Sequence, residues 1–259
     1  MEAKSASMLV AASDYDGTLC RDRRVAASDL QAIDDWRAAG HLFGIVTGRD
    51  LGMIDAEITK WRIPCDFLVC CCGATMYDDN FRELRRIDMD DALIPKLLSH
   101  PLAAASFHFE LSRHGQTFLH IQNAASRFPQ LGVPFTPLTR AEAMALTGLQ
   151  LISFTFADAA ECKTFTDMVM MEFSGRLRSH QNGVNVDVTD WTADKGEGLV
   201  ALCALRGWPA PLVIGDSEND LPMLARFGGF TVETAPEAVR ARARAVYADV
   251  GTMLRRWLR

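Results

Sequence analysis

Apolar residues in the first eighty positions alternate between short continuous runs and a helical spacing. The runs at residues 9–13, 41–47 and 67–72 predict strands that are buried on both faces. The segments between these runs predict helices. One begins at 28–31, whose sequence S-D-L-Q is typical of a capping box, and another spans 51–61 with one apolar stripe. The resulting β-α-β-α-β order predicts a parallel sheet with helices on both of its faces.

The pattern changes in the middle of the chain, where shorter stretches of alternating polarity predict strands and helical spacing separates some of them. This mixture predicts an α+β unit with an antiparallel sheet. The expected strands are 106–111, 118–122, 151–156, 176–181 and 184–188, and the expected helices lie near 91–99, 140–146 and 159–173.

The βα rhythm resumes after Lys195. We expect helices at 196–206, 220–227 and 236–243 and strands at 212–215 and 230–233. The sequence therefore predicts an α/β core formed by residues 1–82 and 189–259, interrupted by an inserted α+β domain at 83–188, which is a usual size for a domain.

The composition of the chain limits which partners and which cellular compartment are expected. The chain of 259 residues has a net charge of −6, and its basic residues are spread along it, which argues against nucleic acid or an anionic membrane as the main partner. No apolar run approaches the roughly 20 residues of a membrane span, and the N-terminal apolar stretch leads straight into an acidic motif, which argues against a cleaved signal. The seven cysteines include no Cys-x-x-Cys pair, so we expect no structural zinc and a reducing cytoplasm.

Two carboxylates follow the first predicted strand, in the segment Asp14-Tyr15-Asp16-Gly17-Thr18. Because side chains alternate along a strand, Asp14 and Asp16 can emerge on the same side, at the mouth of the sheet. By itself such a segment is more often a turn than a site. An EF-hand calcium loop is excluded, because its sixth and twelfth positions would hold Leu19 and Val25 instead of Gly and Glu.

Three further segments supply partners for these carboxylates. Thr47-Gly48-Arg49 ends the second strand, Lys195 opens a helix, and the run 215–220 follows an apolar strand. Each alone is also typical of a loop, a solvated lysine or a helix N-cap. Ligands of open α/β sheets bind beyond the carboxyl ends of the strands. This edge is expected to bring together Asp14, Asp16, Thr47 and Asp216.

These residue types suit phosphoryl transfer. A phosphate monoester adds about two negative charges to an acidic rim, and Mg²⁺ is the ion that commonly bridges carboxylates and phosphate oxygens. Lys195 and the Thr47 hydroxyl would stabilise the equatorial oxygens, and Gly17 would bring backbone N–H groups close to the phosphate. One aspartate can attack phosphorus to give an aspartyl phosphate, while the other protonates the leaving alcohol and later deprotonates water.

The four segments resemble the four motifs of the haloacid dehalogenase (HAD) superfamily of phosphatases. Their order, and the insertion between the second and third, resemble the Cof-type subgroup. The resemblance implies a Rossmann-like parallel sheet core with an inserted α+β cap domain, with Asp14 as the nucleophile and Asp16 as the general acid/base. It also implies phosphate or substrate contacts and ligands for Mg²⁺. The contacts would be Thr47, Gly48, Arg49, Lys195 and Asn219, and the ligands Asp14, the backbone carbonyl of Asp16, and Asp216, with Asp220 as a supporting carboxylate.

The chain departs from the subgroup at one position, where Cys72-Gly73-Ala74 replaces the Asn-Gly-Ala that relatives often carry. This change affects a substrate contact and leaves the phosphoryl machinery intact. The first motif is also similar to that of trehalose-phosphate phosphatases, but the segment 215–224 is closer to the Cof pattern.

The inserted segment offers polar candidates for reading the leaving group. Alternation places His108 and Glu110 on one face of a strand, although a solvent-exposed face has the same pattern. The candidates are His108, Glu110, His114, His120, Asn123, Arg127, Asn182, Asn185 and Asp187.

The leading hypothesis is a Mg²⁺-dependent phosphatase that acts on a small phosphorylated metabolite such as a sugar phosphate. A phosphomutase of the same superfamily is an alternative. An alternative of another class is a phospho-accepting signalling domain of the response-regulator type. Such domains are about half this length and lack an insertion, and Asp16 with the following Gly-Thr fits turnover better than a stable phosphoprotein.

Overall fold

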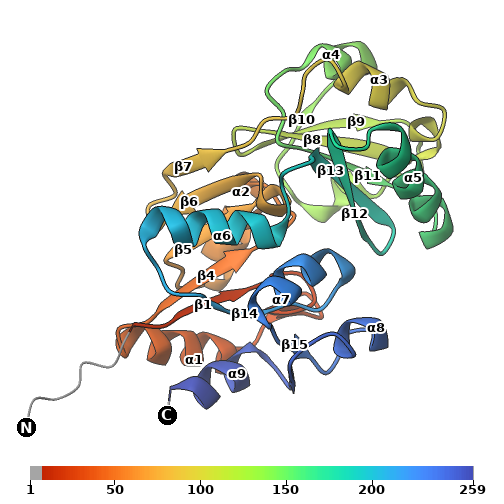
Figure 1. The fold of residues 1–259 in the computed structure, drawn as a ribbon. Helices are drawn as coiled ribbons and strands as arrows, with labels where there is room; N and C mark the ends of the chain where they lie inside the picture. Colours follow the sequence, from red (N-terminus) through yellow and green to blue (C-terminus); the bar gives the residue numbers. More distant parts are fainter. Residues whose placement is uncertain (1–7, 259) are drawn as a thin grey trace, which may run out of the picture.

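The computed structural model describes residues 8–258, whose strands form two six-stranded sheets and two short two-stranded ribbons (Figure 1). In the first sheet four adjacent strands are parallel, as the β-α-β-α-β pattern predicts, and two antiparallel strands follow at one edge. The strand order is β14 (Leu212–Ile214), β1 (Val10–Ser13), β4 (Leu42–Val46), β5 (Phe67–Cys70), β6 (Thr75–Asp78) and β7 (Glu83–Arg86).

Helices cover both faces of this sheet. On one face α1 packs against α9, and on the other α6 packs against α7 (Figure 1). The central strands are buried, which explains their continuous apolar sequence. The helices of this part of the chain are α1 (Ala27–Ala38), α2 (Leu51–Trp61), α6 (Lys195–Arg206), α7 (Leu221–Phe227), α8 (Glu237–Arg240) and α9 (Val250–Trp257).

The predicted capping box at 28–31 is wrong. Helix α1 already begins at Ala27, and its N-cap residue, Ala26, offers no side-chain hydrogen bond. Asp29 is instead fully buried, where it accepts hydrogen bonds from Arg21 and from the backbone N–H of Gly251. Asp29, which lies between the two residues of the predicted box, thus makes a tertiary contact with α9.

The second sheet is formed by the middle of the chain and is antiparallel apart from its edge strand β10. Its order is β10 (Thr136–Pro137), β9 (Gln116–Ile121), β8 (His108–Arg113), β11 (Leu151–Thr155), β13 (Asn185–Asp190) and β12 (Leu177–Asn182). Its helices are α3 (Ile94–Ser99), α4 (Arg140–Ala145) and α5 (Ala159–Glu172).

Each of the two sheets has its own cluster of buried apolar side chains. The predicted fold class, a parallel α/β core with an inserted α+β unit, is confirmed. Residues 83–86, which begin the predicted insertion, form β7 and pair with β6 in the first sheet. The division of the chain into domains at 83 and 188 stays a prediction.

Side chains alternate along the strands of the second sheet, so only every second one faces the first sheet. Phe109, Leu111, Ile152 and Phe154 are fully buried in the cluster beneath α5. The residues between them point the other way, towards the first sheet, because successive side chains of a strand lie on opposite faces.

The remaining short elements include several that the sequence analysis did not predict, such as the ribbon β2–β3 and the strand β16. None of the helices within residues 8–258 is long and apolar enough to cross a membrane. The short elements are β2 (Cys20–Arg21), β3 (Arg24–Val25), β15 (Thr231–Val232) and β16 (Val246–Tyr247), with 3₁₀ turns at Cys71–Gly73, Ala103–Ala105, Phe128–Leu131 and Glu218–Asp220.

Candidate active site

Asp14 lies directly after β1, at the carboxyl edge of the first sheet, and only 3% of its surface is exposed. Its Oδ1 atom accepts a hydrogen bond of 2.7 Å from Lys195 Nζ. Its Oδ2 atom is buried and has no hydrogen-bond partner among the residues that the structure describes. Asp14 also lines a cavity between the two sheets, and a buried carboxylate oxygen without a partner beside a cavity is a candidate ligand contact.

Lys195 is the first residue of α6, whose N-cap residue Asp194 accepts a hydrogen bond from the backbone of Glu197. The lysine side chain is fully buried, and its Nζ atom lies 2.7 Å from Asp14 Oδ1 and 2.6 Å from Asp220 Oδ1. A third contact, of 3.3 Å, joins it to Asn219 Oδ1. Burial lowers the pKa of Lys195, but Asp14 and Asp220 raise it more, so the net pKa is above its ordinary value.

Three carboxylates converge beneath the cavity. Asp14, Asp216 and Asp220 each place one oxygen within 4.8 Å of the others. Burial raises the pKa of Asp14 and of Asp216, and repulsion from Asp220 adds to both shifts. Crowded carboxylate oxygens of this kind are the ligands that a hard divalent cation prefers, so the donor set fits Mg²⁺.

Both carboxylate oxygens of Asp220 already accept hydrogen bonds from other residues of the protein. Its Oδ2 atom accepts hydrogen bonds from the backbone N–H groups of Asp216 and Ser217, both at 3.0 Å, while its other oxygen accepts from Lys195. These bonds hold the loop after β14 in place. Asp220 therefore positions Asp216, and Asp14 keeps an unused oxygen.

Gly17 is required for the close approach of the loop after β1 to Asp216. A Cβ atom at this position would lie 2.3 Å from Asp216 Oδ2, and the backbone has a φ of +90°, which favours glycine. The N–H group of Gly17 donates to the carbonyl of Cys20 at 2.9 Å. The turn therefore uses the N–H group of Gly17 itself, and the expectation that this turn brings backbone N–H groups close to a phosphate stays a prediction.

Asp16 has a partner of its own. Both of its oxygens accept hydrogen bonds from Arg49, at 2.7 and 2.8 Å, and the guanidinium also lies over the Tyr15 ring. Asp14 and Asp16 therefore reach the same cavity from one strand end with different cations. Thr47 is buried beside them, and its Oγ1 atom accepts from the backbone N–H of Arg49, which leaves its hydroxyl proton free to be donated.

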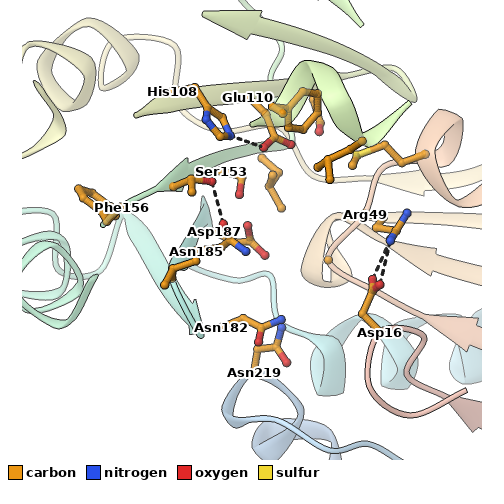
Figure 2. A pocket seen from close by; sticks show the side chains of 18 of the residues that line it. Asp16, Arg49, His108, Glu110, Ser153, Phe156, Asn182, Asn185, Asp187 and Asn219 are labelled. Atoms are coloured by element: carbon orange, nitrogen blue, oxygen red, sulfur yellow. Dashed lines mark hydrogen bonds and ion pairs between the residues drawn. The ribbon is translucent and has the colours of Figure 1, made fainter. Parts of the chain in front are cut away.

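The cavity has a volume of about 560 Å³ and lies between the two sheets (Figure 2). This volume is in the usual range for small-molecule sites. Seven of the predicted site residues line it, whereas Asp216 and Asp220 lie behind Asp14. The seven are Asp14, Asp16, Thr47, Gly48, Arg49, Lys195 and Asn219.

The second sheet supplies the opposite wall. Six of the nine polar candidates of the inserted segment line the cavity: His108, Glu110, Arg127, Asn182, Asn185 and Asp187. Of the other three, His120 bonds the carbonyl of Leu138, His114 lies beside Arg86, and Asn123 accepts from the backbone of Ala125.

The sequence analysis missed other parts of this wall. Ser112, Ser153 and Thr155 line the cavity, and the alternation of residues 151–155 could have indicated the last two. Apolar side chains also line it, and no local pattern distinguishes them from core residues. They are Met53, Phe107, Phe128, Leu131, Phe156 and Val184.

Cys72, which follows β5 of the first sheet, contacts Asp187 in β13 of the second sheet. Its Sγ atom donates to Asp187 Oδ2 at 3.4 Å, and burial raises the pKa of the thiol well above its usual value, so it remains a donor. The same carboxylate lies against Gly48, where an added Cβ atom would be 2.8 Å from it. Asp187 is thus positioned where the inserted sheet meets the loop after β4.

Comparisons with known proteins agree with this architecture. The model of the haloacid dehalogenase-like hydrolase family matches residues 11–251. No curated protein gives a significant match to the chain.

Solved structures share the fold at low sequence identity. A HAD/COF-like hydrolase from Plasmodium vivax is 22% identical with a TM-score of 0.82, covering 98% of this chain and 96% of that chain. A haloacid dehalogenase-like hydrolase from B. subtilis is 18% identical with a TM-score of 0.83, covering 96% and 99% of the two chains. The HAD subclass IIB sugar phosphatase BT4131 is 18% identical with a TM-score of 0.81, covering 97% and 98%.

Proposed function

The chain belongs to the haloacid dehalogenase-like hydrolase family, and we propose that it is a Mg²⁺-dependent phosphatase of small phosphorylated metabolites, such as sugar phosphates. In this proposal residues 1–82 and 189–259 form the catalytic core and 83–188 form a cap. The reaction proceeds through an aspartyl phosphate on Asp14. That a fold neighbour, BT4131, is a sugar phosphatase supports the choice of substrate.

The observation that carries the proposal is the state of the Asp14 carboxylate. One oxygen is fixed by Lys195, the other is buried and has no hydrogen-bond partner within residues 8–258, and the residue lines the cavity. A carboxylate held in one orientation with a free oxygen is suited to attack on phosphorus. Most buried polar groups have a hydrogen-bond partner, so an unpartnered carboxylate oxygen beside a cavity supports a functional role.

Lys195 and Thr47 would bind the phosphoryl oxygens. Within residues 8–258, Lys195 Nζ forms three hydrogen bonds, and the longest, to Asn219, is the one that a phosphoryl oxygen can most easily replace. The hydroxyl proton of Thr47 is the second donor. Both groups would stabilise negative charge that develops in the transition state.

Asp16 would transfer protons to the leaving alcohol and from the attacking water. Its side chain is 46% exposed and reaches the cavity from the strand end that carries Asp14. Arg49 bonds both of its oxygens, so one of these bonds must open before Asp16 can carry a proton. Such an opening is possible because the pair is partly exposed.

Asp14, Asp216 and the backbone carbonyl of Asp16 would hold Mg²⁺, with Asp220 in support. The ion would neutralise the charge of the phosphate and of the acidic cluster. The convergence of oxygens from Asp14, Asp216 and Asp220 within 4.8 Å of one another agrees with this donor set. A reducing, cytoplasmic location is part of the proposal, since all seven cysteines are free thiols.

The proposal is tested by a screen of phosphorylated metabolites with the full chain, with and without Mg²⁺, and with Asp14→Asn as the control. Release of phosphate that needs both Mg²⁺ and Asp14 supports it. Transfer of the phosphoryl group between sugar positions without free phosphate would indicate a mutase, and a long-lived phosphoprotein would indicate signalling. A screen without any Asp14-dependent turnover would overturn the enzymatic interpretation.

A further inference from the structure

The cavity wall formed by the second sheet is an ordered array of polar side chains. Strand register sets His108, Thr155 and Asn185 in one row across β8, β11 and β13, and Thr155 donates to Asn185 at 2.7 Å. A second row, two residues away on each strand, contains Glu110, Ser153 and Asp187 (Figure 2). All six side chains line the cavity, so this wall can contact the part of a ligand that lies away from Asp14.

Two carboxyls of this wall have no strong cationic partner. Within residues 8–258, neither Glu110 nor Asp187 forms an ion pair with a lysine or an arginine. Asp187 interacts with Ser153 and with the thiol of Cys72. Glu110 lies 3.4 Å from His108 Nε2. Burial raises the pKa of both carboxyls, and repulsion from Asp187 adds to the shift of Glu110.

Two of the cations that line the cavity already pair with carboxylates outside this wall. Lys195 is shared by two carboxylates of the first sheet, and Arg49 is bonded to Asp16. The remaining arginine, Arg127, is exposed to solvent at the start of a short 3₁₀ turn. The two rows of this wall therefore carry two carboxyls and no lysine or arginine, so they would repel a leaving group that carries a second negative charge.

His108 adds a polar atom that the protein does not satisfy. The residue is 4% exposed, and its Nδ1 atom interacts with Ser126 Oγ at 2.9 Å. Its Nε2 atom approaches Glu110 without hydrogen-bond geometry and has no other partner in the described part of the chain. A buried ring nitrogen in this state, at the wall of a cavity, indicates a ligand with hydrogen-bonding groups.

We propose that the leaving group carries a primary ammonium group, which Glu110 and Asp187 bind, among hydroxyls that His108 and Ser153 contact. The substrate class is then a phosphorylated amino sugar or a comparable amino alcohol. An ammonium ion supplies both the positive charge and the donors that two partly buried carboxyls lack. This inference rests on the proposed function, because it assigns the leaving group of the same reaction.

The test compares two substrates that differ by one group, glucosamine 6-phosphate and glucose 6-phosphate, with the full chain and Mg²⁺. We expect kcat/KM to be at least about tenfold higher for the amine, as one charge-assisted hydrogen bond supplies. Glu110→Gln and Asp187→Asn should each reduce this ratio towards 1. Asp167→Asn, which removes a carboxylate of α5 that is 63% exposed, is the matched control and should keep the wild-type ratio.

A wild-type ratio of 1 or below, or a ratio that both Glu110→Gln and Asp187→Asn leave unchanged, would overturn the inference. Hydrolysis of p-nitrophenyl phosphate serves as the reference reaction. If Asp14 is needed for that hydrolysis and the amine is not preferred, the inference fails and the proposed function stands. If none of the three esters is hydrolysed in an Asp14-dependent manner, the proposed function fails as well.

Discussion

Lys195 Nζ donates a 2.7 Å hydrogen bond to Asp14 Oδ1, although 181 positions separate the two residues in the chain. The lysine also contacts Asp220, so one buried ammonium ion holds two carboxylates of the acidic cluster. The relationship fixes one oxygen of Asp14 and leaves the other free. It connects the proposed chemistry of the site directly to its stability.

The first prediction concerns Asp14→Asn. An amide cannot form an acyl phosphate under these conditions, so phosphate release should fall by at least about a thousandfold. The same change removes one of three crowded carboxylates, so the metal-free variant should melt at the same temperature as the wild type or higher. Phosphate assays and thermal denaturation measure the two effects. Full activity, or a large loss of stability, would contradict the assignment.

Lys195→Met should strongly destabilise the protein. It leaves Asp14 and Asp220 without their shared cation, and removing one partner of a buried ion pair costs about 3–5 kcal/mol. Lys163→Met is the matched control, because Lys163 and Asp167 form an exposed pair on α5 that contributes under about 1 kcal/mol. Urea unfolding at neutral pH gives both values. Equal losses in the two variants would show that Lys195 is not a buried bridge.

Gly17→Ala should weaken Mg²⁺ binding. The new Cβ atom would meet Asp216 Oδ2 at 2.3 Å and displace a proposed metal ligand. Gly40→Ala is a close control, since Gly40 has a φ of +85° and no atom within 4 Å of an added Cβ, so only backbone strain of about 1–2 kcal/mol is introduced. Titration calorimetry with Mg²⁺ should show at least about a tenfold loss for Gly17→Ala alone. Unchanged affinity would argue against Asp216 as a ligand.

His180 should make stability fall in acid. Burial in β12 lowers its pKa to about 4 from an ordinary value of 6.5, so the unfolded chain takes up the proton first as the pH falls. The stability from neutral His180 is therefore present above pH 6.5 and is lost as the pH falls towards 4, by about 3 kcal/mol at most.

His180→Gln should remove this part of the pH dependence. Unfolding free energies of the variant and the wild type, measured by urea titration between pH 7 and 4, should converge in acid. His120→Gln, a change at a half-buried ring, controls for the loss of imidazole packing. A constant difference between His180→Gln and wild type across this range would contradict the prediction.

Local sequence was sufficient to predict much of the sheet edge at the proposed active site. Buried strands leave a continuous apolar run, and the residues that follow such strands in a parallel sheet share one edge, so the convergence of Asp14, Thr47 and Asp216 could be predicted. Helix α2 was predicted at its observed bounds, because its apolar stripe and the following Pro64 are local signals. Helix α1 runs from Ala27 to Ala38, close to the predicted range, but the contact of Asp29 with Gly251 joins residues 222 positions apart and has no local signal.

The wall of the second sheet could not be read in this way. Alternation in 108–112 and 151–155 shows that one face is polar, but it is the same whether that face meets water or a cavity. The hydrogen-bond partners of Asp16 and Asp187 could not be predicted from the sequence either. Arg49 and Cys72 approach these carboxylates only once the chain has folded.

The sequence by itself determined the family, the two kinds of sheet and the order of the residues at the proposed phosphoryl site, because each depends on local periodicity and on short motifs. Only the tertiary structure decided which oxygen of Asp14 is free, which cations are already paired and which polar face encloses the ligand. Those features depend on distances between segments far apart in the chain. Burial and pairing, which set the charge and reactivity of a side chain, exist only once those segments have packed.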